Sequence, residues 1–294
     1  MGRWWPAAQS SPGPLDAPGR AMVLGATGGI GRAFAERLAA GGRPLLVVAR
    51  NRDRLEDLAR RLTATYRVAV ETLAADLADE KGLRSVEDGI RGDASLQLLV
   101  NSAGIASWGR FADLDLEREL DVIRVNVIAG VRLTRAALSV MLPRRSGAIV
   151  NVASLGGYIP LPFCATYGGT KAYLVSFTEA LYEELRGSGV RIQVVCPGFT
   201  RTEMFARAGA DVTKMPSYIW VSPETIARHS LATLRRDRPV CIPGLRVRMF
   251  WLLCRLRARS ALRRRAGEFF GNFETYRLEE RAAPGEGKAR PEDR

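Results

Sequence analysis

The sequence predicts an α/β fold of the Rossmann type, a doubly wound parallel sheet in a single domain, with a basic helical extension at the C-terminus. Two observations support this fold class. Short, fully apolar runs such as Leu45–Ala49 alternate with longer helical patterns, which is typical of a parallel sheet covered on both faces. A glycine-rich turn follows the first of these runs, at the place where such folds bind phosphate groups.

The composition limits the classes of protein to which the chain can belong. With 294 residues, 47% of them hydrophobic and 26% charged, the chain can bury a substantial core. Its single histidine excludes a multi-histidine metal site and argues against a Ser-His-Asp triad, so we expect no metal. The net charge of +13 either reflects the source genome or favours a nucleic acid, an anionic lipid or a phosphorylated ligand. Four cysteines without a CxxC pair favour reduced thiols in a cytoplasmic protein.

Apolar periodicity locates the elements of the predicted sheet and the helices that cover it. Strands are expected at 21–25, 45–49, 67–73, 97–100, 148–153, 191–196 and 240–242. Helices are expected at 29–40, 53–65, 80–92, 116–141 and 166–186. Ligands of such sheets bind at the carboxyl ends of the strands, near the switch in strand order, so the candidate residues are sought there.

A glycine-rich turn connects the first predicted strand to the first helix. Glycine lets the backbone turn tightly and approach a pyrophosphate, and the helix N-terminus offers free N–H groups. The cofactor contacts expected in this turn are Gly25, Thr27, Gly28, Gly29, Ile30 and Gly31. A glycine-rich turn that binds no ligand is the alternative interpretation.

The end of the second predicted strand indicates which dinucleotide binds. NAD sites usually place a carboxylate there, on the 2′-hydroxyl of the ribose. Here the first polar side chain is Arg50, whose guanidinium suits a 2′-phosphate. We therefore predict NADP(H) as the cofactor. Asp53 is expected to cap or open the next helix, and Arg52 and Arg54 either assist Arg50 or are solvated.

Ser154, Tyr167 and Lys171 form the predicted catalytic group. Tyr167 and Lys171 are four residues apart and share one face of a helix. A nearby ammonium stabilises a phenolate and lowers the pKa of a tyrosine. Tyr167 would exchange a proton with a substrate oxygen held by Ser154, while a nicotinamide exchanges a hydride with the carbon. A tyrosine–lysine pair alone is usually a solvated helix face, and the glycine turn is what favours the catalytic interpretation.

Together these residues resemble the short-chain dehydrogenase/reductase family over residues 21–244. The further matching segments, in the order typical of the family, are Asp76-Leu77, Asn101-Ser102-Ala103-Gly104, Asn126, Pro197-Gly198 and Thr200-Arg201-Thr202. Two departures from the family pattern are Ser102 and Leu24, and neither removes a predicted catalytic group.

The resemblance implies a role for each matching residue. Asp76 would contact the adenine, with Leu77 beside it at the cofactor. Asn126, the fourth predicted catalytic residue, would hold a water that links Lys171 to solvent as a proton relay. Residues expected to line the cofactor are Asn101, Ala103 and Gly104. Residues expected at its nicotinamide end are Pro197, Gly198, Thr200 and Thr202, together with Tyr167 and Lys171.

Four segments are expected along the chain. They are a flexible N-terminal arm over 1–19, a Rossmann-type catalytic domain over 20–244, a basic amphipathic helical extension over 245–281 and a disordered tail over 282–294. Within the domain, the apolar connection 199–220 is expected to act as a mobile lid over a hydrophobic ligand.

The extension has an apolar stripe flanked by arginines. The stripe consists of Leu245, Met249, Leu252, Leu253 and Leu256. Residues 245–265 would suit a membrane surface, and packing on the chain's own domain or on a neighbouring subunit is the alternative. Nucleic acid is an unlikely partner because no binding motif accompanies the charge.

These observations predict an NADP(H)-dependent oxidoreductase that interconverts a ketone and a secondary alcohol, in the reductive direction. The apolar lid and the segment 155–163 favour a hydrophobic substrate, lipid-like, 3-oxoacyl or steroid-like. The alternative is an NADPH-binding regulatory or peripheral membrane protein with little turnover. The resemblance implies a homodimer or homotetramer, and the extension would place a cytoplasmic protein on the cytoplasmic face of a membrane.

Overall fold

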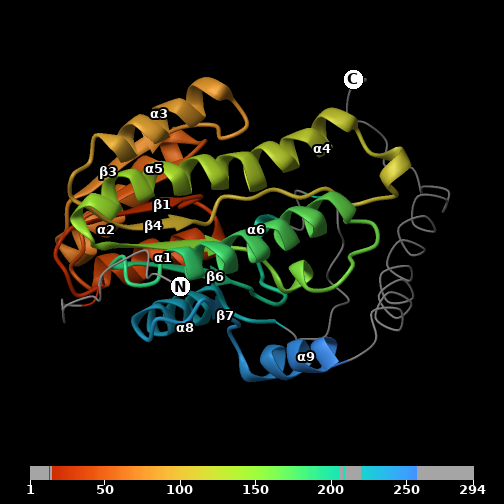
Figure 1. Ribbon diagram of the computed structural model, residues 1–294. Helices are drawn as coiled ribbons and strands as arrows, with labels where there is room; N and C mark the ends of the chain where they lie inside the picture. The colour runs from red at the N-terminus through yellow and green to blue at the C-terminus, as the bar shows by residue number, and fades with distance from the viewer. Residues whose placement is uncertain (1–12, 14, 205–207, 209–219, 257–294) are drawn as a thin grey trace, which may run out of the picture.

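A seven-stranded parallel sheet forms the centre of the computed structural model, with strand order β3-β2-β1-β4-β5-β6-β7 (Figure 1). The structure describes residues 13, 15–204, 208 and 220–256. The strands are β1 (Arg20–Leu24), β2 (Leu45–Ala49), β3 (Val70–Ala74), β4 (Leu96–Asn101), β5 (Gly147–Val152), β6 (Val190–Val195) and β7 (Val240–Cys241). The predicted fold class is confirmed, because every strand pair in the sheet is parallel.

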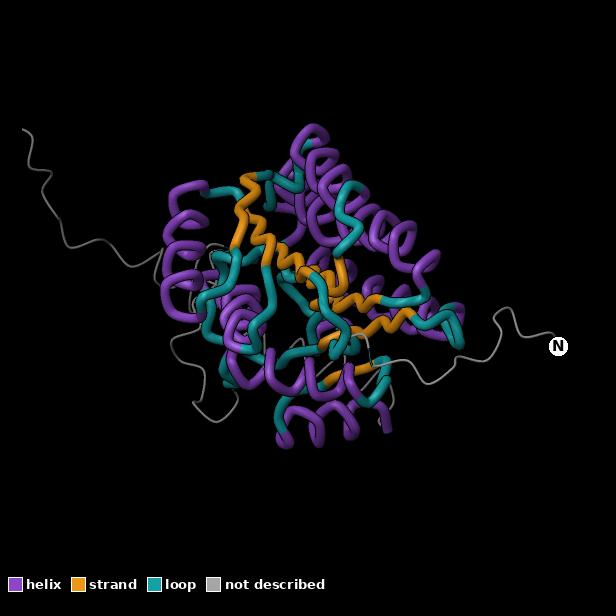
Figure 2. Tube along the Cα trace, turned by 90° about the vertical axis from the view of Figure 1, so that its left-hand side faces the viewer, coloured by secondary structure: helices purple, strands orange, loops and turns teal. Residues whose placement is uncertain are grey.

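Helices cover both faces of the sheet, so that the strands lie between two helical layers (Figure 2). One layer contains α1 (Gly29–Ala40), α2 (Arg52–Tyr66) and α8 (Pro223–Arg235), whose buried side chains share one core cluster with the sheet. The opposite layer contains α3 (Glu80–Arg91), α4 (Leu116–Ile123), α5 (Ala129–Arg144) and α6 (Ala165–Glu184). Burial on both faces explains why strands such as β2 read as continuous apolar runs.

The strand order switches between β1 and β4. The chain runs from β1 outward to β3, and then returns to place β4 on the other side of β1. The carboxyl ends of these two strands lead into the glycine-rich turn and into the segment that begins at Asn101. Because ligands bind at such a switch point, the fold brings two of the predicted cofactor segments to the expected place.

The predicted helix 116–141 is continuous but not uniform. A π-helical turn, Arg124–Ile128, joins α4 to α5, so that the helix extends from Leu116 to Arg144. This helix is long and apolar enough to cross a membrane by length and composition, but half of its apolar window is buried within the fold. Such π turns often lie at functional sites.

The end of the N-terminal arm packs on the domain. Leu15 is buried in the core cluster of the α1 layer, and the Arg43 guanidinium donates to the carbonyl oxygens of Leu15, Ala17 and Gly19. The expectation of a flexible arm as far as residue 19 is therefore wrong for residues 15–19. These contacts form over a separation of more than twenty residues, which local sequence patterns do not reveal.

The C-terminal extension begins with α9 (Leu245–Leu256), which lies beyond β7 at the edge of the molecule (Figure 1). The rest of the expected extension and the expected tail lie outside the described residues. Most of the expected lid also lies outside them, but its two ends meet, since the Phe199 and Trp220 rings contact edge to face at 6.0 Å.

Candidate active site

Three of the four predicted catalytic residues, all but Asn126, converge at the carboxyl end of β5. Ser154 follows this strand, while Tyr167 and Lys171 lie one turn apart on α6. The Ser154 side chain hydrogen-bonds the Tyr167 hydroxyl, and both Tyr167 and Lys171 are buried. The Leu155 amide donates to the Pro197 carbonyl oxygen at 2.8 Å, which ties the loop after β5 to the loop after β6. The structure therefore brings together a hydroxyl, a phenol and an amine.

Burial dominates the protonation of this group. The Lys171 ammonium donates to the Val152 carbonyl oxygen at 2.9 Å and lies 5.6 Å from the centre of the Tyr167 ring. Burial lowers the pKa of Lys171 to about 8. Burial also raises the pKa of Tyr167 above its ordinary value, while the Ser154 hydrogen bond acts in the opposite direction. The prediction that the pKa of Tyr167 is lowered is thus wrong, because burial has the larger effect and raises it.

Asn126 lies in the π-helical turn and holds the loop after β4. Its amide oxygen accepts from the Ile105 amide, and its amide nitrogen donates to the Ile105 carbonyl oxygen, both at 2.9 Å. The same nitrogen donates to the Thr170 hydroxyl at 3.0 Å, and Thr170 immediately precedes Lys171. Asn126 therefore connects three segments of the site. Its expected role of holding a water stays a prediction.

The glycine-rich turn has a geometry that only glycine can satisfy at two positions. Gly25 adopts a φ of +69°, and a Cβ atom there would lie 2.9 Å from the Ala103 backbone nitrogen. A Cβ atom on Gly31 would collide with the Gly25 carbonyl oxygen. Gly28 is the N-cap of α1 and supplies no side-chain cap, so the first N–H groups of this helix stay open to a ligand. The turn therefore fits a pyrophosphate.

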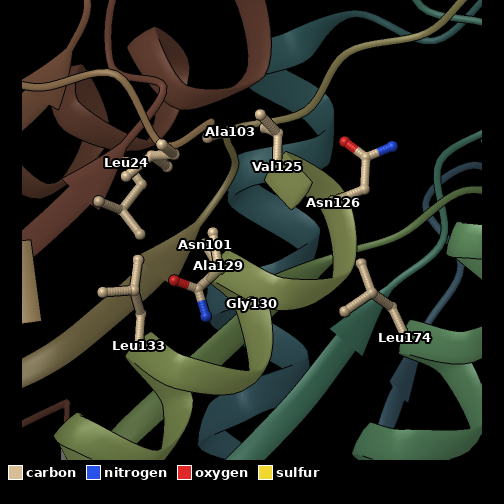
Figure 3. A pocket seen from close by; sticks show the side chains of 10 residues that line it. Leu24, Asn101, Ala103, Val125, Asn126, Ala129, Gly130, Leu133 and Leu174 are labelled. Carbon is tan, nitrogen blue, oxygen red and sulfur yellow. The ribbon is translucent and has the colours of Figure 1, made fainter. Parts of the chain in front are cut away.

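A small internal cavity lies beneath this turn, between the end of β4 and α5. Its volume is about 10 Å³, and its lining includes Leu24, Asn101, Ala103 and Asn126 (Figure 3). The Asn101 amide nitrogen donates to Asn151 at 2.7 Å, and its amide oxygen is buried without a hydrogen-bond partner among the described residues. The cavity is too small for a dinucleotide. It is a small gap in the packing between the end of β4 and α5.

The predicted adenine-end residues also lie together. The Arg50 guanidinium lies 3.9 Å from the Asp76 carboxylate, and both side chains are about half exposed. The Asp76 carboxylate also accepts from the Ala78 amide at 3.0 Å, while Leu77 is buried. The structure therefore places Arg50 beside Asp76, and the contact of Arg50 with a 2′-phosphate stays a prediction.

The remaining residues predicted at the nicotinamide end lie on the loop after β6. The Thr202 methyl group lies against Gly29. A Cβ atom added to Gly29 would be 2.7 Å from the methyl carbon of Thr202. Thr200 is buried, and its hydroxyl donates to the Gly198 carbonyl oxygen at 3.1 Å. Gly198 itself packs against α9, since a Cβ atom there would lie 3.0 Å from Val247.

An apolar cluster surrounds the buried face of Tyr167. Its buried members are Ala106, Val122, Cys164 and Tyr167, and its half-buried members are Ile105, Trp108, Leu161, Met204 and Ala208. The Ser107 hydroxyl bonds the buried Glu119 carboxylate beside this cluster, and the Cys164 thiol donates to the Ser107 carbonyl oxygen at 3.2 Å. Sequence reasoning missed Ser107, Glu119 and Cys164, because residues on three separate segments carry no shared motif.

The comparisons with known proteins agree with this geometry. The short chain dehydrogenase family matches residues 20–213. The chain is 33% identical over 217 residues to hydroxysteroid dehydrogenase-like protein 1 of Gallus gallus, over 73% of this chain and 65% of that protein. It is 31% identical to the very-long-chain 3-oxoacyl-CoA reductase of Homo sapiens, over 73% of this chain and 68% of that protein. It is also 31% identical to the inactive hydroxysteroid dehydrogenase-like protein 1 of Homo sapiens, over 73% of this chain and 65% of that protein.

Two solved structures show the same fold. A short-chain dehydrogenase from Sphingobium yanoikuyae in complex with NADPH superposes with a TM-score of 0.75 at 33% identity, covering 95% of this chain and all of that one. The L-sorbose reductase of Gluconobacter frateurii, complexed with NADPH and L-sorbose, gives a TM-score of 0.69 at 27% identity, covering 77% of this chain and 95% of that one. Relatives of this chain therefore bind NADPH on the same fold.

Proposed function

Since the chain belongs to the short-chain dehydrogenase/reductase family, a family of oxidoreductases, we propose that it reduces a hydrophobic ketone to a secondary alcohol with NADPH. One observation carries the proposal. The Tyr167 phenol is buried, hydrogen-bonded to Ser154 and packed in an apolar cluster, and its burial raises its pKa. A raised pKa keeps the phenol protonated at neutral pH, and a protonated phenol is the form that gives a proton to a carbonyl oxygen in the reductive direction.

Each residue of the group has a defined task in this reaction. Bound NADPH supplies the hydride to the carbonyl carbon. The Ser154 hydroxyl holds the carbonyl oxygen beside the Tyr167 hydroxyl, and Tyr167 donates the proton. Lys171 stabilises the phenolate that this donation leaves, because its ammonium lies on the same helical face. Asn126 fixes the backbone on which Thr170 and Lys171 lie.

The apolar cluster around Tyr167 supports a lipid-like ketone of the 3-oxoacyl or steroid type as the substrate. The human relative is named for a very-long-chain 3-oxoacyl-CoA substrate, which agrees with this class. The measurement is kcat/KM with NADPH over a series of 3-oxoacyl thioesters of increasing chain length. We expect kcat/KM to rise with length, and a flat series would contradict a lipid pocket.

The cofactor preference is tested on Arg50. NADPH and NADH are titrated against the wild type, Arg50→Ala and the control Arg61→Ala, which removes an exposed arginine elsewhere on α2. We expect the wild type and the control to prefer NADPH, and Arg50→Ala to lose about tenfold or more of that preference. Equal binding of NADH by all three would show that Arg50 is a surface charge. Tight NADPH binding without turnover on any ketone would favour a regulatory protein with little turnover.

We also propose that the chain forms a homodimer or homotetramer through α4, α5 and α6. Large apolar side chains are exposed on these helices, namely Leu116, Ile123, Ile128 and Tyr173. Such an unpaired apolar face is typical of a subunit interface. Light scattering after size exclusion tests the proposal, and a monomer at micromolar concentration would overturn it.

A further inference from the structure

The helix α9 has two different faces. Its inner face packs on the catalytic domain through Val247, which contacts Gly198, and through Trp251, whose ring meets Tyr158 edge to face at 5.8 Å. Gly198 follows β6 and Tyr158 follows the turn that begins at Ser154. The inner face therefore fixes α9 on the two loops that carry the substrate end of the site.

The outer face of α9 is apolar and exposed. Leu245, Met249 and Leu252 are 75%, 59% and 52% exposed, and their spacing of four and three residues places them on one face. Val247 and Trp251 lie on the opposite face of the same helix. One face of α9 thus packs on the domain, as one prediction for the extension states, while the opposite face is exposed. The alternative prediction, contact with a membrane surface, can apply only to the exposed face.

Arginines flank this apolar face. Arg246 and Arg248 are exposed, and they lie about 90° and about 70° of helical rotation from the centre of the apolar row, on its two sides. The sequence has no aspartate or glutamate between Asp237 and Glu268. An exposed apolar row between cationic edges, without acidic residues, matches the pattern of a helix that lies in the headgroup region of an anionic bilayer.

We propose that α9 docks on the surface of an anionic lipid bilayer, with Leu245, Met249 and Leu252 in the acyl boundary and Arg246 and Arg248 on the headgroups. A second copy of this face is a poor occupant, because an isologous contact would bring like-charged arginines together. A nucleic acid would leave the apolar row against phosphates. The bilayer alone satisfies both the charge and the apolar area.

Docking in this orientation has a consequence for the substrate, and this part rests on the proposed function. The inner face of α9 lies on the loops after β5 and β6, so the helix would hold the substrate end of the site close to the bilayer. A lipid-like ketone would then reach the site from the membrane rather than from water. Vesicle binding itself does not depend on turnover.

The experiment is co-sedimentation of the full chain with vesicles of phosphatidylcholine alone or with about 30% phosphatidylserine. The variants are Arg246→Gln/Arg248→Gln and Leu245→Ser/Met249→Ser/Leu252→Ser. The matched control is Arg37→Gln/Arg61→Gln, which removes two exposed arginines from α1 and α2. We expect the wild type and the control to bind the anionic vesicles, and the α9 arginine variant to bind them roughly thirtyfold more weakly.

The apolar variant should lose at least tenfold in binding to the anionic vesicles while its thermal unfolding and its NADPH titration stay unchanged, since all three side chains are exposed. Equal losses in the α9 arginine variant and in the control would show that only the total charge matters, and would overturn the proposal. So would a wild type that does not bind anionic vesicles. A wild type that binds vesicles but reduces no ketone would contradict the proposed function and leave the docking intact.

Discussion

Arg54 and Glu203 form a two-pronged ion pair between residues that are 149 positions apart in the chain. The guanidinium nitrogens of Arg54 donate to the two carboxylate oxygens of Glu203 at 3.2 and 2.9 Å. Arg54 lies in the first turn of α2, close to Arg50, and Glu203 directly follows Thr202. The pair therefore joins the adenine side of the predicted cofactor site to the segment at its nicotinamide end.

Removing the carboxylate of Glu203 should free Arg54 for a 2′-phosphate. The pair is exposed, so the loss of its attraction costs at most about 1 kcal/mol of stability. For Glu203→Gln we expect NADPH to bind up to about fivefold more tightly, with NADH binding unchanged. Fluorescence titration measures both, and Glu184→Gln, an exposed acid on α6, is the control. An equal gain for NADH would show that the effect does not pass through the 2′-phosphate.

Tyr167→Phe should abolish ketone reduction while it preserves the cofactor site. The substitution removes only the hydroxyl that donates the proton, and we expect kcat to fall by roughly 10²–10⁴-fold. NADPH affinity should stay within about twofold. Tyr182→Phe is the matched control, because Tyr182 lies on the same helix and its hydroxyl bonds the Asp237 carbonyl oxygen at 3.0 Å. Full activity in Tyr167→Phe would exclude this residue as the acid.

The buried amine of Lys171 should make stability depend on pH. Burial lowers the pKa of Lys171 from 10.5 to about 8, so between these values the unfolded chain binds a proton that the folded protein does not. The free energy of unfolding therefore rises as pH increases from about 8 to about 10. Burial raises the pKa of Tyr167, so the unfolded chain loses that proton first and the stability due to Tyr167 falls above about pH 10.

Denaturant titrations of the wild type and of Lys171→Met isolate this contribution. The stability difference, wild type minus variant, should grow by on the order of 2 kcal/mol between pH 8 and pH 10. Lys81→Met is the control, because Lys81 is exposed on α3 and should show no such growth. A constant difference across this range would mean that Lys171 keeps an ordinary pKa in the folded protein.

Two glycines of the same turn should differ in their tolerance of alanine. A Cβ atom on Gly31 meets the Gly25 carbonyl oxygen, which is backbone and cannot move aside, so Gly31→Ala should cost about 1–3 kcal/mol. A Cβ atom on Gly28 would lie 3.4 Å from the same oxygen, an ordinary contact, so Gly28→Ala should cost less than about 1 kcal/mol. Thermal unfolding separates the two, and equal melting temperatures would contradict the close approach at Gly31.

The sequence predicts those features that depend on local signals. The strand Leu45–Ala49, the glycine turn and the Tyr167–Lys171 pair all follow from apolar runs, residue types and spacing, and the structure has each of them in place. The contacts of Leu15, Glu203 and the amide of Asn126 depend on segments far apart in the chain, and no periodicity encodes them. The raised pKa of Tyr167 could not be predicted from the sequence either. It results mainly from burial, and the sequence does not show how deeply this side chain is buried.

The cysteine next to Tyr167 has a consequence for chemical labelling. Burial raises the pKa of Cys164 to about 12, and Cys196 and Cys241 are also buried with raised pKa values. Because thiolates, not thiols, attack electrophiles, these three side chains should resist maleimides, iodoacetamide and peroxide at neutral pH. Covalent inhibitors aimed at the pocket would gain little from Cys164.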